Sequence, residues 1–396
     1  MSVQEHRKVS VFDTTLRDGE QAPRNGIGPE RKTELALQIE ALGVDLIEAG
    51  FPASSPSERK ATELISQHLK SARFVTFCRS NRADIEIAVE AGGTVNHQIQ
   101  VMATGSDMHL VHKRGITRKE AVAEVIDAVT FARSLGMTDI SVAIEDASRG
   151  EPELLRAITE SAIEVGATTF VLADTSGCML PAEYAKLVST FRTWAPHPLV
   201  VSTHCHNDFG LSTANAIAGL EAGADEVQAT VGGIGERAGN TPLEEVVAIL
   251  AYKKDLLGLW SSVSTERLCD VYGDLRDAIG LPGPRNKPIF GAYAFATAAG
   301  VHQQGIFANP ATYEYVEPMR FGRERKILVS RHSGRVVLRH ILEELGIKAD
   351  NNQLTSLYDL YIASRPDGDC EELSDLRERL AAELTHDESA TGAAAK

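Results

Sequence analysis

The chain has 396 residues, of which 43% are hydrophobic and 24% are charged, so its composition excludes a disordered, collagenous or disulfide-scaffold class. Its formal net charge of −15 argues against nucleic acid and an anionic membrane surface as partners. Neither a signal-peptide core nor an 18-residue apolar run is present, and the five cysteines form no CxxC motif. We therefore expect a cytoplasmic protein without disulfides, a structural zinc or a membrane span.

Short β-branched runs recur along the first part of the chain, each followed by a stretch with helical periodicity. Eight of them are predicted to be strands, at residues 9–12, 45–50, 73–78, 97–102, 139–144, 169–174, 199–204 and 226–231. Glycines that suit a helix C-terminus precede several strands, at Gly43, Gly92, Gly136, Gly166 and Gly223. Eight strands that alternate with helices predict an α/β fold, a TIM (β/α)8 barrel over residues 1–285. An open doubly wound sheet is the alternative, because the sequence does not give the strand order.

The pattern changes after residue 285. A stretch rich in Gly, Pro and Ala predicts a linker subdomain over 286–325, and helical periodicity predicts a small, mainly helical subdomain over 326–385. Residues 386–396 are expected to be a disordered tail.

Polar residues gather where the predicted strands end, which is where TIM barrels carry their reactive groups. His204 and His206 share one side of an extended strand, because side chains alternate with a period of two. They complete a predicted N2O2 ligand set for Mg²⁺, Mn²⁺, Co²⁺ or Zn²⁺, namely Asp18, His204, His206 and Asn240. A 2-oxo acid could chelate such an ion, with Arg17 placed to neutralise a growing alkoxide. Each feature alone also fits an ordinary surface loop or a core histidine.

Five motifs carry a family resemblance: DTTLRDGEQ at 13–21, HCHNDFGLSTAN at 204–215, GIGERAGNTPLEE at 233–245, HQQG at 302–305 and HSGR at 332–335. Together they resemble the 2-isopropylmalate synthase and homocitrate synthase family. The resemblance implies a metal-dependent TIM barrel that condenses acetyl-CoA with a 2-oxo acid and hydrolyses the thioester, giving a 2-substituted malate and free CoA. It also implies a homodimer with exchanged C-terminal segments.

The resemblance assigns roles residue by residue. The metal-ligand positions match Asp18, His204, His206 and Asn240. The catalytic positions match Arg17, Glu145, His302 and Tyr313, of which His302 and Tyr313 would reach into the other subunit's barrel. Expected substrate contacts are Arg17, Gln21, Ala143, Val171 and Thr175. Expected CoA contacts are Gly233, Gly235, Glu236 and Arg237.

The oxo acid is left open by the sequence. Residues 51–56 and 103–113 resemble isopropylmalate synthases, whereas EDASR at 145–149 and the chain length resemble homocitrate synthases. Isopropylmalate synthases usually carry Ser and Asn where this chain has Ala143 and Val171. We favour the 2-isopropylmalate reading for a role in amino-acid biosynthesis. Homocitrate synthesis and a specialised pathway that uses phosphonopyruvate are the alternatives, and Arg79 and Arg82 are candidate contacts for an extra anionic group.

Three other classes are less favoured. Hydroxymethylglutaryl-CoA lyases share the metal motif but use a cysteine in a glycine-rich loop. In this chain the glycine-rich loop reads GGIGERAGN, at 232–240, and contains no cysteine. Biotin-linked carboxyltransferases need a lysine near the metal, and no lysine ends the predicted strands. A non-catalytic metal-binding module would not need Arg17, Glu145, His302 and Tyr313 together.

Overall fold

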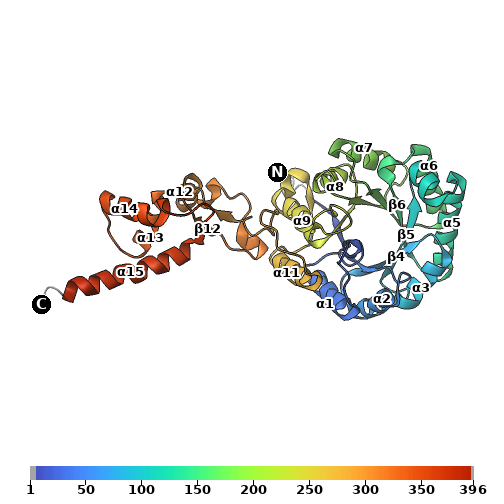
Figure 1. Cartoon of the computed structure of the whole chain (residues 1–396). Helices are drawn as coiled ribbons and strands as arrows, with labels where there is room; N and C mark the ends of the chain where they lie inside the picture. Colours follow the sequence, from blue (N-terminus) through green and yellow to red (C-terminus); the bar gives the residue numbers. More distant parts are fainter. Residues whose placement is uncertain (1–5, 394–396) are drawn as a thin grey trace. The chain divides into compact units, whose positions relative to one another are not determined.

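A computed structural model describes residues 6–393 of the chain (Figure 1). The chain divides into two compact units, Met1–Pro282 and Gly283–Lys396. Each unit has its own hydrophobic core, and the two are described separately below. Among the described residues, no helix combines the length and the apolar character that crossing a membrane requires.

The first unit is a closed barrel of eight parallel strands in sequential order. The strands are β2 (Ser10–Asp13), β3 (Leu46–Gly50), β4 (Arg73–Arg79), β5 (His97–Thr104), β6 (Asp139–Glu145), β7 (Thr169–Asp174), β8 (Val200–Cys205) and β9 (Glu226–Ala229). The pairing of β2 with both β3 and β9 closes the sheet. The predicted TIM barrel is therefore confirmed, and the open sheet is excluded.

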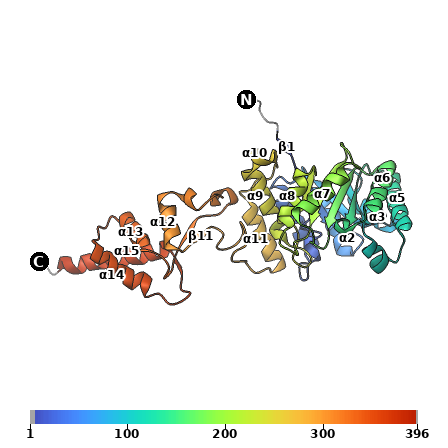
Figure 2. The ribbon, with the colours of Figure 1, turned by 90° about the horizontal axis from the view of Figure 1, so that it is seen from above.

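Helices surround the barrel on its outer face (Figure 2). The main ones are α1 (Pro29–Glu40), α2 (Pro56–His68), α3 (Arg82–Gly92), α5 (Arg118–Ser134), α6 (Pro152–Val165), α7 (Pro181–Arg192), α8 (Ser212–Glu221), α9 (Leu243–Tyr252) and α11 (Leu268–Ile279). Their N-termini show the capping that the sequence favours: Thr117 and Glu120 form a capping box on α5. The shorter elements are β1 (Arg7–Lys8), α4 (Asp107–His109), the π-helical turn η2 (Leu110–Arg114), α10 (Lys254–Leu257) and β10 (Leu259–Trp260).

Glycines end several barrel helices. The backbone is left-handed, with positive φ, at four of the five predicted positions, Gly43, Gly136, Gly166 and Gly223. The prediction for Gly92 is wrong by one residue, because α3 continues through Gly92 and the left-handed residue is Gly93, at φ +70°.

The second unit is built on a small three-stranded sheet. Strand β11 (Ala296–Thr297) pairs with β12 (Lys326–Val329), which pairs with β13 (Glu371–Glu372). The helices are α12 (Gly300–Ala308), α13 (Arg335–Glu344), α14 (Asn351–Tyr358) and α15 (Leu373–Ala393). Buried Val337, Ile341, Leu376 and Leu380 belong to its core.

Two predictions for this region need correction. The boundary between 286–325 and 326–385 is not a domain boundary, because the pairing of β11 with β12 joins the two segments in one sheet. The tail predicted from residue 386 does not start there, because α15 continues to Ala393, through a stretch that contains helix-favouring alanine and glutamate. The last three residues of the predicted tail, 394–396, lie outside the described residues.

Candidate active site

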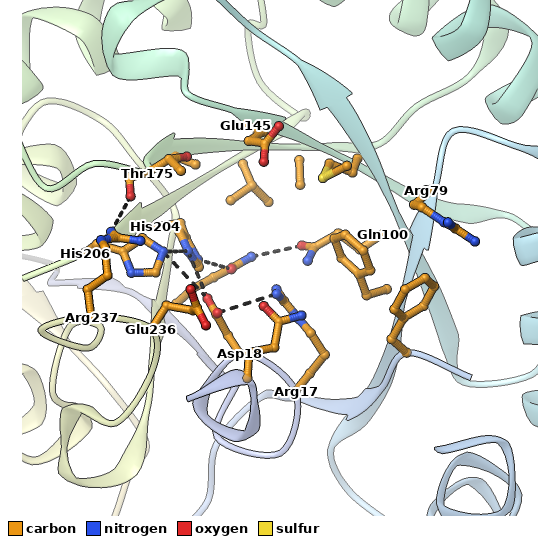
Figure 3. A pocket seen from close by; sticks show the side chains of 18 of the residues that line it. Arg17, Asp18, Arg79, Gln100, Glu145, Thr175, His204, His206, Glu236 and Arg237 are labelled. Atoms are coloured by element: carbon orange, nitrogen blue, oxygen red, sulfur yellow. Dashed lines mark hydrogen bonds and ion pairs between the residues drawn. The ribbon is translucent and has the colours of Figure 1, made fainter. Parts of the chain in front are cut away.

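A cavity of about 460 Å³ opens at the carboxyl ends of the barrel strands (Figure 3). Eleven of the residues expected from the sequence line it: Arg17, Asp18, Gln21, Ala143, Glu145, Val171, Thr175, His204, His206, Glu236 and Arg237. These side chains come from segments up to 220 positions apart in the sequence, and barrel closure brings them together. The cavity is therefore where the chemistry of this unit is concentrated.

Asp18, His204 and His206 point their ligand atoms at one another. The Nε2 atom of His204 lies 3.1 Å from Oδ2 of Asp18 and 3.4 Å from Nε2 of His206. All three residues are buried, and their ligand atoms lie within 4.8 Å of one another. Two imidazoles and one carboxylate at this spacing suit a divalent transition metal.

Asn240 provides a fourth group beside this cluster. An antiparallel bridge places its backbone against His206. Its Nδ2 atom donates to the carbonyl oxygen of Ile234 (3.2 Å), whereas Oδ1 is buried with no hydrogen-bond partner. A buried amide oxygen without a partner is costly unless something binds it. The donor set of the four predicted residues thus fits a divalent cation.

The protonation states within the cluster favour ligation. Burial alone would raise the pKa of Asp18, but the charge of Arg17 and the adjoining His204 outweigh burial and hold it well below its usual range. Burial, with His204 adding to the effect, lowers the pKa of His206 to about 4. The carboxylate form of Asp18 and the neutral form of His206, which are the forms that bind metals, therefore prevail near neutral pH.

A row of buried polar residues crosses the barrel interior, and Gln100 and Gln228, which belong to it, also line the cavity. Nδ1 of His204 lies 2.8 Å from Oε1 of Gln228, and Nε2 of Gln228 donates to Oε1 of Gln100 (3.0 Å). Nε2 of Gln100 donates in turn to Oε1 of Glu48 (3.0 Å). The second oxygen of Glu48 forms an ion pair with Nε of Arg17 at 2.8 Å. These contacts extend from the cluster of Asp18, His204 and His206 to the guanidinium of Arg17, and Figure 3 shows the cluster, Gln100 and Arg17 around the cavity.

Glu145, at the end of β6, is held by two basic side chains that the sequence reading did not assign. Nζ of Lys113 lies 2.6 Å from one carboxylate oxygen, and Nδ1 of His109 lies 3.2 Å from the other. Lys113 also lines the cavity, although no lysine ends the predicted strands. The reason is that α4 and η2 follow β5 directly, and η2 contains Lys113.

Thr175 follows β7, and its hydroxyl accepts a hydrogen bond from the backbone N–H of Asp146 (2.8 Å). Arg237 forms a bidentate ion pair with Asp208 (2.8 and 2.9 Å), and it also donates to the carbonyl oxygen of Thr175 (2.6 Å). The side chain of Arg237 thus ties the glycine-rich loop to the ends of β7 and β8.

The glycine-rich loop needs its glycines to fold. A Cβ atom at Gly239 would lie 1.9 Å from the carbonyl oxygen of Gly233, and a Cβ at Gly235 would lie 2.2 Å from Nδ2 of Asn240. Both glycines also have positive φ. Glu236 and Arg237 line the cavity, whereas Gly233 and Gly235 are not among its lining residues. Gly233 and Gly235 therefore shape the loop that contains Asn240.

One wall of the cavity is apolar. Met102, Ala143 and Val171 are register partners across β5, β6 and β7. The rings of Phe51 and Phe77 pack edge to face with centroids 5.2 Å apart. All five of these side chains line the cavity.

His302 and Tyr313 belong to the second unit, where their rings lie 4.2 Å apart between centroids. His302 is on α12, and Tyr313 follows a short 3-10 turn. Both line a second cavity of about 420 Å³, together with Glu314 and Arg325. The two residues, eleven positions apart in the sequence, are thus neighbours in the second unit.

Comparison with known proteins agrees with these features. The model of the family described as HMGL-like matches residues 8–274, and the model described as homocitrate synthase post-HMGL domain-like matches residues 289–363. The chain belongs to the HMGL-like family. It is 42% identical to a 2-isopropylmalate synthase of Sulfolobus acidocaldarius, over 88% of each chain. It is 40% identical to a probable 2-isopropylmalate synthase of Ignicoccus hospitalis, over 89% of this chain and 86% of the relative.

These relatives confirm the family inferred from the motifs, and with it the expectation that the protein is an enzyme. Solved structures show the same barrel. A hydroxymethylglutaryl-CoA lyase from Pseudomonas aeruginosa superposes with a TM-score of 0.61 at 19% identity, over 77% of this chain and 99% of the lyase. The HMG-CoA lyase from Brucella melitensis gives a TM-score of 0.60 at 21% identity, over 69% and 99%. At such identities the likeness concerns the fold alone.

Proposed function

We propose that this protein condenses acetyl-CoA with a 2-oxo acid whose side chain is uncharged, and that 2-oxoisovalerate is the preferred acid. Hydrolysis of the thioester then releases 2-isopropylmalate and CoA. The observation that carries the proposal is the buried cluster of Asp18, His204 and His206 at the floor of a cavity that Arg17 also lines. The names of the relatives support the same activity, and the model described as homocitrate synthase post-HMGL domain-like supports a synthase without specifying 2-oxoisovalerate.

The protein's own groups suit each step. Asp18, His204, His206 and Asn240 would hold a divalent ion, whose chemistry is to polarise the ketone of the oxo acid. Arg17 would stabilise the negative charge that develops on the ketone oxygen. Thr175, with Gln21 nearby, would orient the substrate carboxylate, and Glu236 and Arg237 would contact CoA at the rim of the cavity.

The carbon–carbon bond requires a base. A base removes a proton from the acetyl methyl group, the methyl carbon attacks the ketone carbon, and the ketone oxygen takes a proton to become a hydroxyl group. Water then displaces CoA from the thioester. We assign the proton transfers to Glu145, His302 and Tyr313, with His302 and Tyr313 supplied by the partner of a homodimer. Imidazole is the side chain that most often acts as a general base at neutral pH.

The charge pattern of the cavity favours an uncharged substrate side chain. Each positive side chain that lines it already has an anionic partner: Arg17 with Glu48, Arg79 with Asp84, Lys113 with Glu145 and Arg237 with Asp208. A second carboxylate or a phosphonate would lose water without gaining an unpaired cation, which is costly. The apolar wall that includes Ala143 and Val171 would instead gain by covering an isopropyl group. Homocitrate and phosphonate chemistry are therefore disfavoured.

The test is a substrate panel on the purified protein with acetyl-CoA and Mn²⁺, followed by release of free thiol. We expect kcat/KM for 2-oxoisovalerate to exceed that for 2-oxoglutarate or phosphonopyruvate by about 100-fold, as leaving a charge buried and unpaired costs several kcal/mol. Arg79→Met should change kcat/KM for 2-oxoisovalerate by less than about threefold, as expected for an exposed ion pair. Arg82→Met is the matched control, because Arg82 pairs with Asp127 and does not line the cavity.

Preference for a dianionic acid that disappears in the Arg79 variant would overturn the substrate assignment. Absence of thiol release with every acid in the presence of metal would overturn the synthase proposal itself. We also infer a reducing, cytoplasmic setting, since none of the five cysteines, all within the described residues, forms a disulfide.

A further inference from the structure

Gln100 and Gln228 are unusual because they are amides inside the barrel. Their exposed fractions are 1% and 2%, and they come from β5 and β9, which lie on different sides of the barrel. A buried amide is stable only when its polar atoms find partners. Each contact that these two side chains make therefore has a defined donor and a defined acceptor.

The direction of the hydrogen bonds determines which ring nitrogen of His204 carries the hydrogen. Nε2 of Gln228 donates to Gln100, so it is the carbonyl oxygen Oε1 of Gln228 that faces Nδ1 of His204 at 2.8 Å. An acceptor opposite Nδ1 requires the hydrogen to be on Nδ1. Nε2 of His204, the atom that faces Asp18, is then the nitrogen with a lone pair for a metal.

The other end of the row holds the arginine of the cavity. Gln100 donates from Nε2 to Oε1 of Glu48, so the two oxygens of this buried carboxylate have separate partners. Oε2 accepts a hydrogen bond from the Thr14 hydroxyl and pairs with Arg17. With both oxygens engaged, the carboxylate has little freedom to rotate, and the guanidinium that it pairs with is held in place.

We infer that Gln228 and Gln100 are positioning residues that join the metal ligand His204 to the substrate arginine Arg17. Gln228 selects the metal-binding tautomer of His204, and Gln100 orients Glu48 so that Glu48 holds Arg17. The part that concerns Arg17 rests on the proposed function, whereas the part that concerns His204 depends only on metal binding.

The first measurement is Mn²⁺ binding to the full-length protein by titration calorimetry. We expect Gln228→Met to raise the Kd for Mn²⁺ by about tenfold or more, the usual effect of removing the partner of a histidine ligand. Gln228→Glu keeps an oxygen opposite Nδ1 and should stay within about threefold of the wild-type Kd. The matched control is Gln98→Met, because Gln98 is a similarly buried glutamine of the barrel, on β5, but donates to Asp139 and does not line the cavity. Wild-type affinity in Gln228→Met, or an equal loss in Gln98→Met, would overturn the inference.

The second measurement separates the two ends. Gln100→Met should leave the Kd for Mn²⁺ within about threefold and lower kcat/KM for the oxo acid by about tenfold, since a misplaced charge stabiliser costs catalysis. An unchanged kcat/KM would remove Gln100 from the proposal.

Histidine-selective ¹⁵N NMR of the Mg²⁺-loaded wild-type protein reads the tautomer of His204 without changing either glutamine. It should show His204, identified by its loss in His204→Gln, as the Nδ1–H tautomer, and the Nε2–H tautomer would contradict the inference. If the protein binds Mn²⁺ as expected but produces no CoA, the proposed function fails while the role of Gln228 stands.

Discussion

Glu226, the first residue of the barrel strand β9, is costly to ionise in the folded protein. Its side chain is buried at the start of β9, and Oε1 has no hydrogen-bond partner. Burial raises its pKa from an ordinary 4.5 to about 7, and the neighbouring Ser202 hydroxyl offsets only part of that effect. Since the folded pKa lies above the unfolded one, the associated stability is complete below pH 4.5 and is lost as pH rises through 7.

The magnitude follows from the linkage relation. A difference of roughly 2.5 pKa units is worth about 3 kcal/mol at full ionisation, and about 2 to 3 kcal/mol of that develops between pH 5 and pH 8. Glu226→Gln keeps the shape of the side chain and removes the charge. We expect its free energy of unfolding, relative to wild type, to increase by that amount between pH 5 and pH 8.

Urea unfolding of both proteins at several pH values, each with the same ionic strength, measures this difference. Glu164→Gln is the control, because it removes one negative charge from the exposed surface of α6. A relative stability of Glu226→Gln that is constant with pH, or that falls as pH rises, would refute the reasoning.

Four further predictions follow from individual contacts. Asn240→Leu should weaken Mn²⁺ binding about tenfold, since it removes a buried oxygen that has no other partner, and calorimetry would show it; unchanged affinity would exclude Asn240 as a ligand. Gly239→Ala should lower kcat about tenfold or more, because an added Cβ would collide with the backbone there. Gly93→Ala should leave kcat unchanged, because a Cβ at Gly93 meets no atom; equal effects on kcat would mean that φ strain alone matters. Burial lowers the pKa of His97 to about 4, so the wild-type protein should lose stability as pH falls from 6.5 toward 4. In His97→Gln the free energy of unfolding, measured with urea, should depend less on pH over that range; an identical dependence would contradict the assignment. Chelation of metal should abolish turnover, Mn²⁺ should restore it, and activity that survives exhaustive chelation would exclude the metal from the reaction.

The barrel was predictable because its strands are short buried runs separated by helical stretches. The strand predicted at 199–204 occurs at Val200–Cys205, a shift of one residue. Parallel order followed from the alternation of strands and helices. Closure made the strand-end residues converge, so the metal cluster could be expected from three motifs far apart in the sequence.

The supporting contacts could not be predicted in the same way. Gln100 bonds to Glu48 and Gln228, which are 52 and 128 positions away, and only the closed barrel brings these three together. The available signal was weak: single polar residues inside otherwise apolar strands, where an unpaired amide or carboxylate would be costly. Lys113 was missed because the π-helical turn η2 that contains it has no simple sequence signature, and His109 was missed because it ends α4, which is only three residues long.

The pairing of β11 with β12 was missed for another reason. Each of the paired segments is only two to four residues long, so neither shows a clear alternation of apolar and polar residues. The boundary at residue 325 was drawn from a change in composition, which does not reveal that two short strands share a sheet.

The central claim is that a new carbon–carbon bond joins the acetyl methyl group to the ketone carbon of the oxo acid. Acetyl-CoA labelled with ¹³C in both acetyl carbons, incubated with 2-oxoisovalerate, Mn²⁺ and the protein, tests it by mass spectrometry of the products. We expect 2-isopropylmalate that carries both labelled carbons, formed in equal amount with free CoA. Free CoA accompanied only by labelled acetate would contradict it, because the protein would then be a thioesterase and not a synthase.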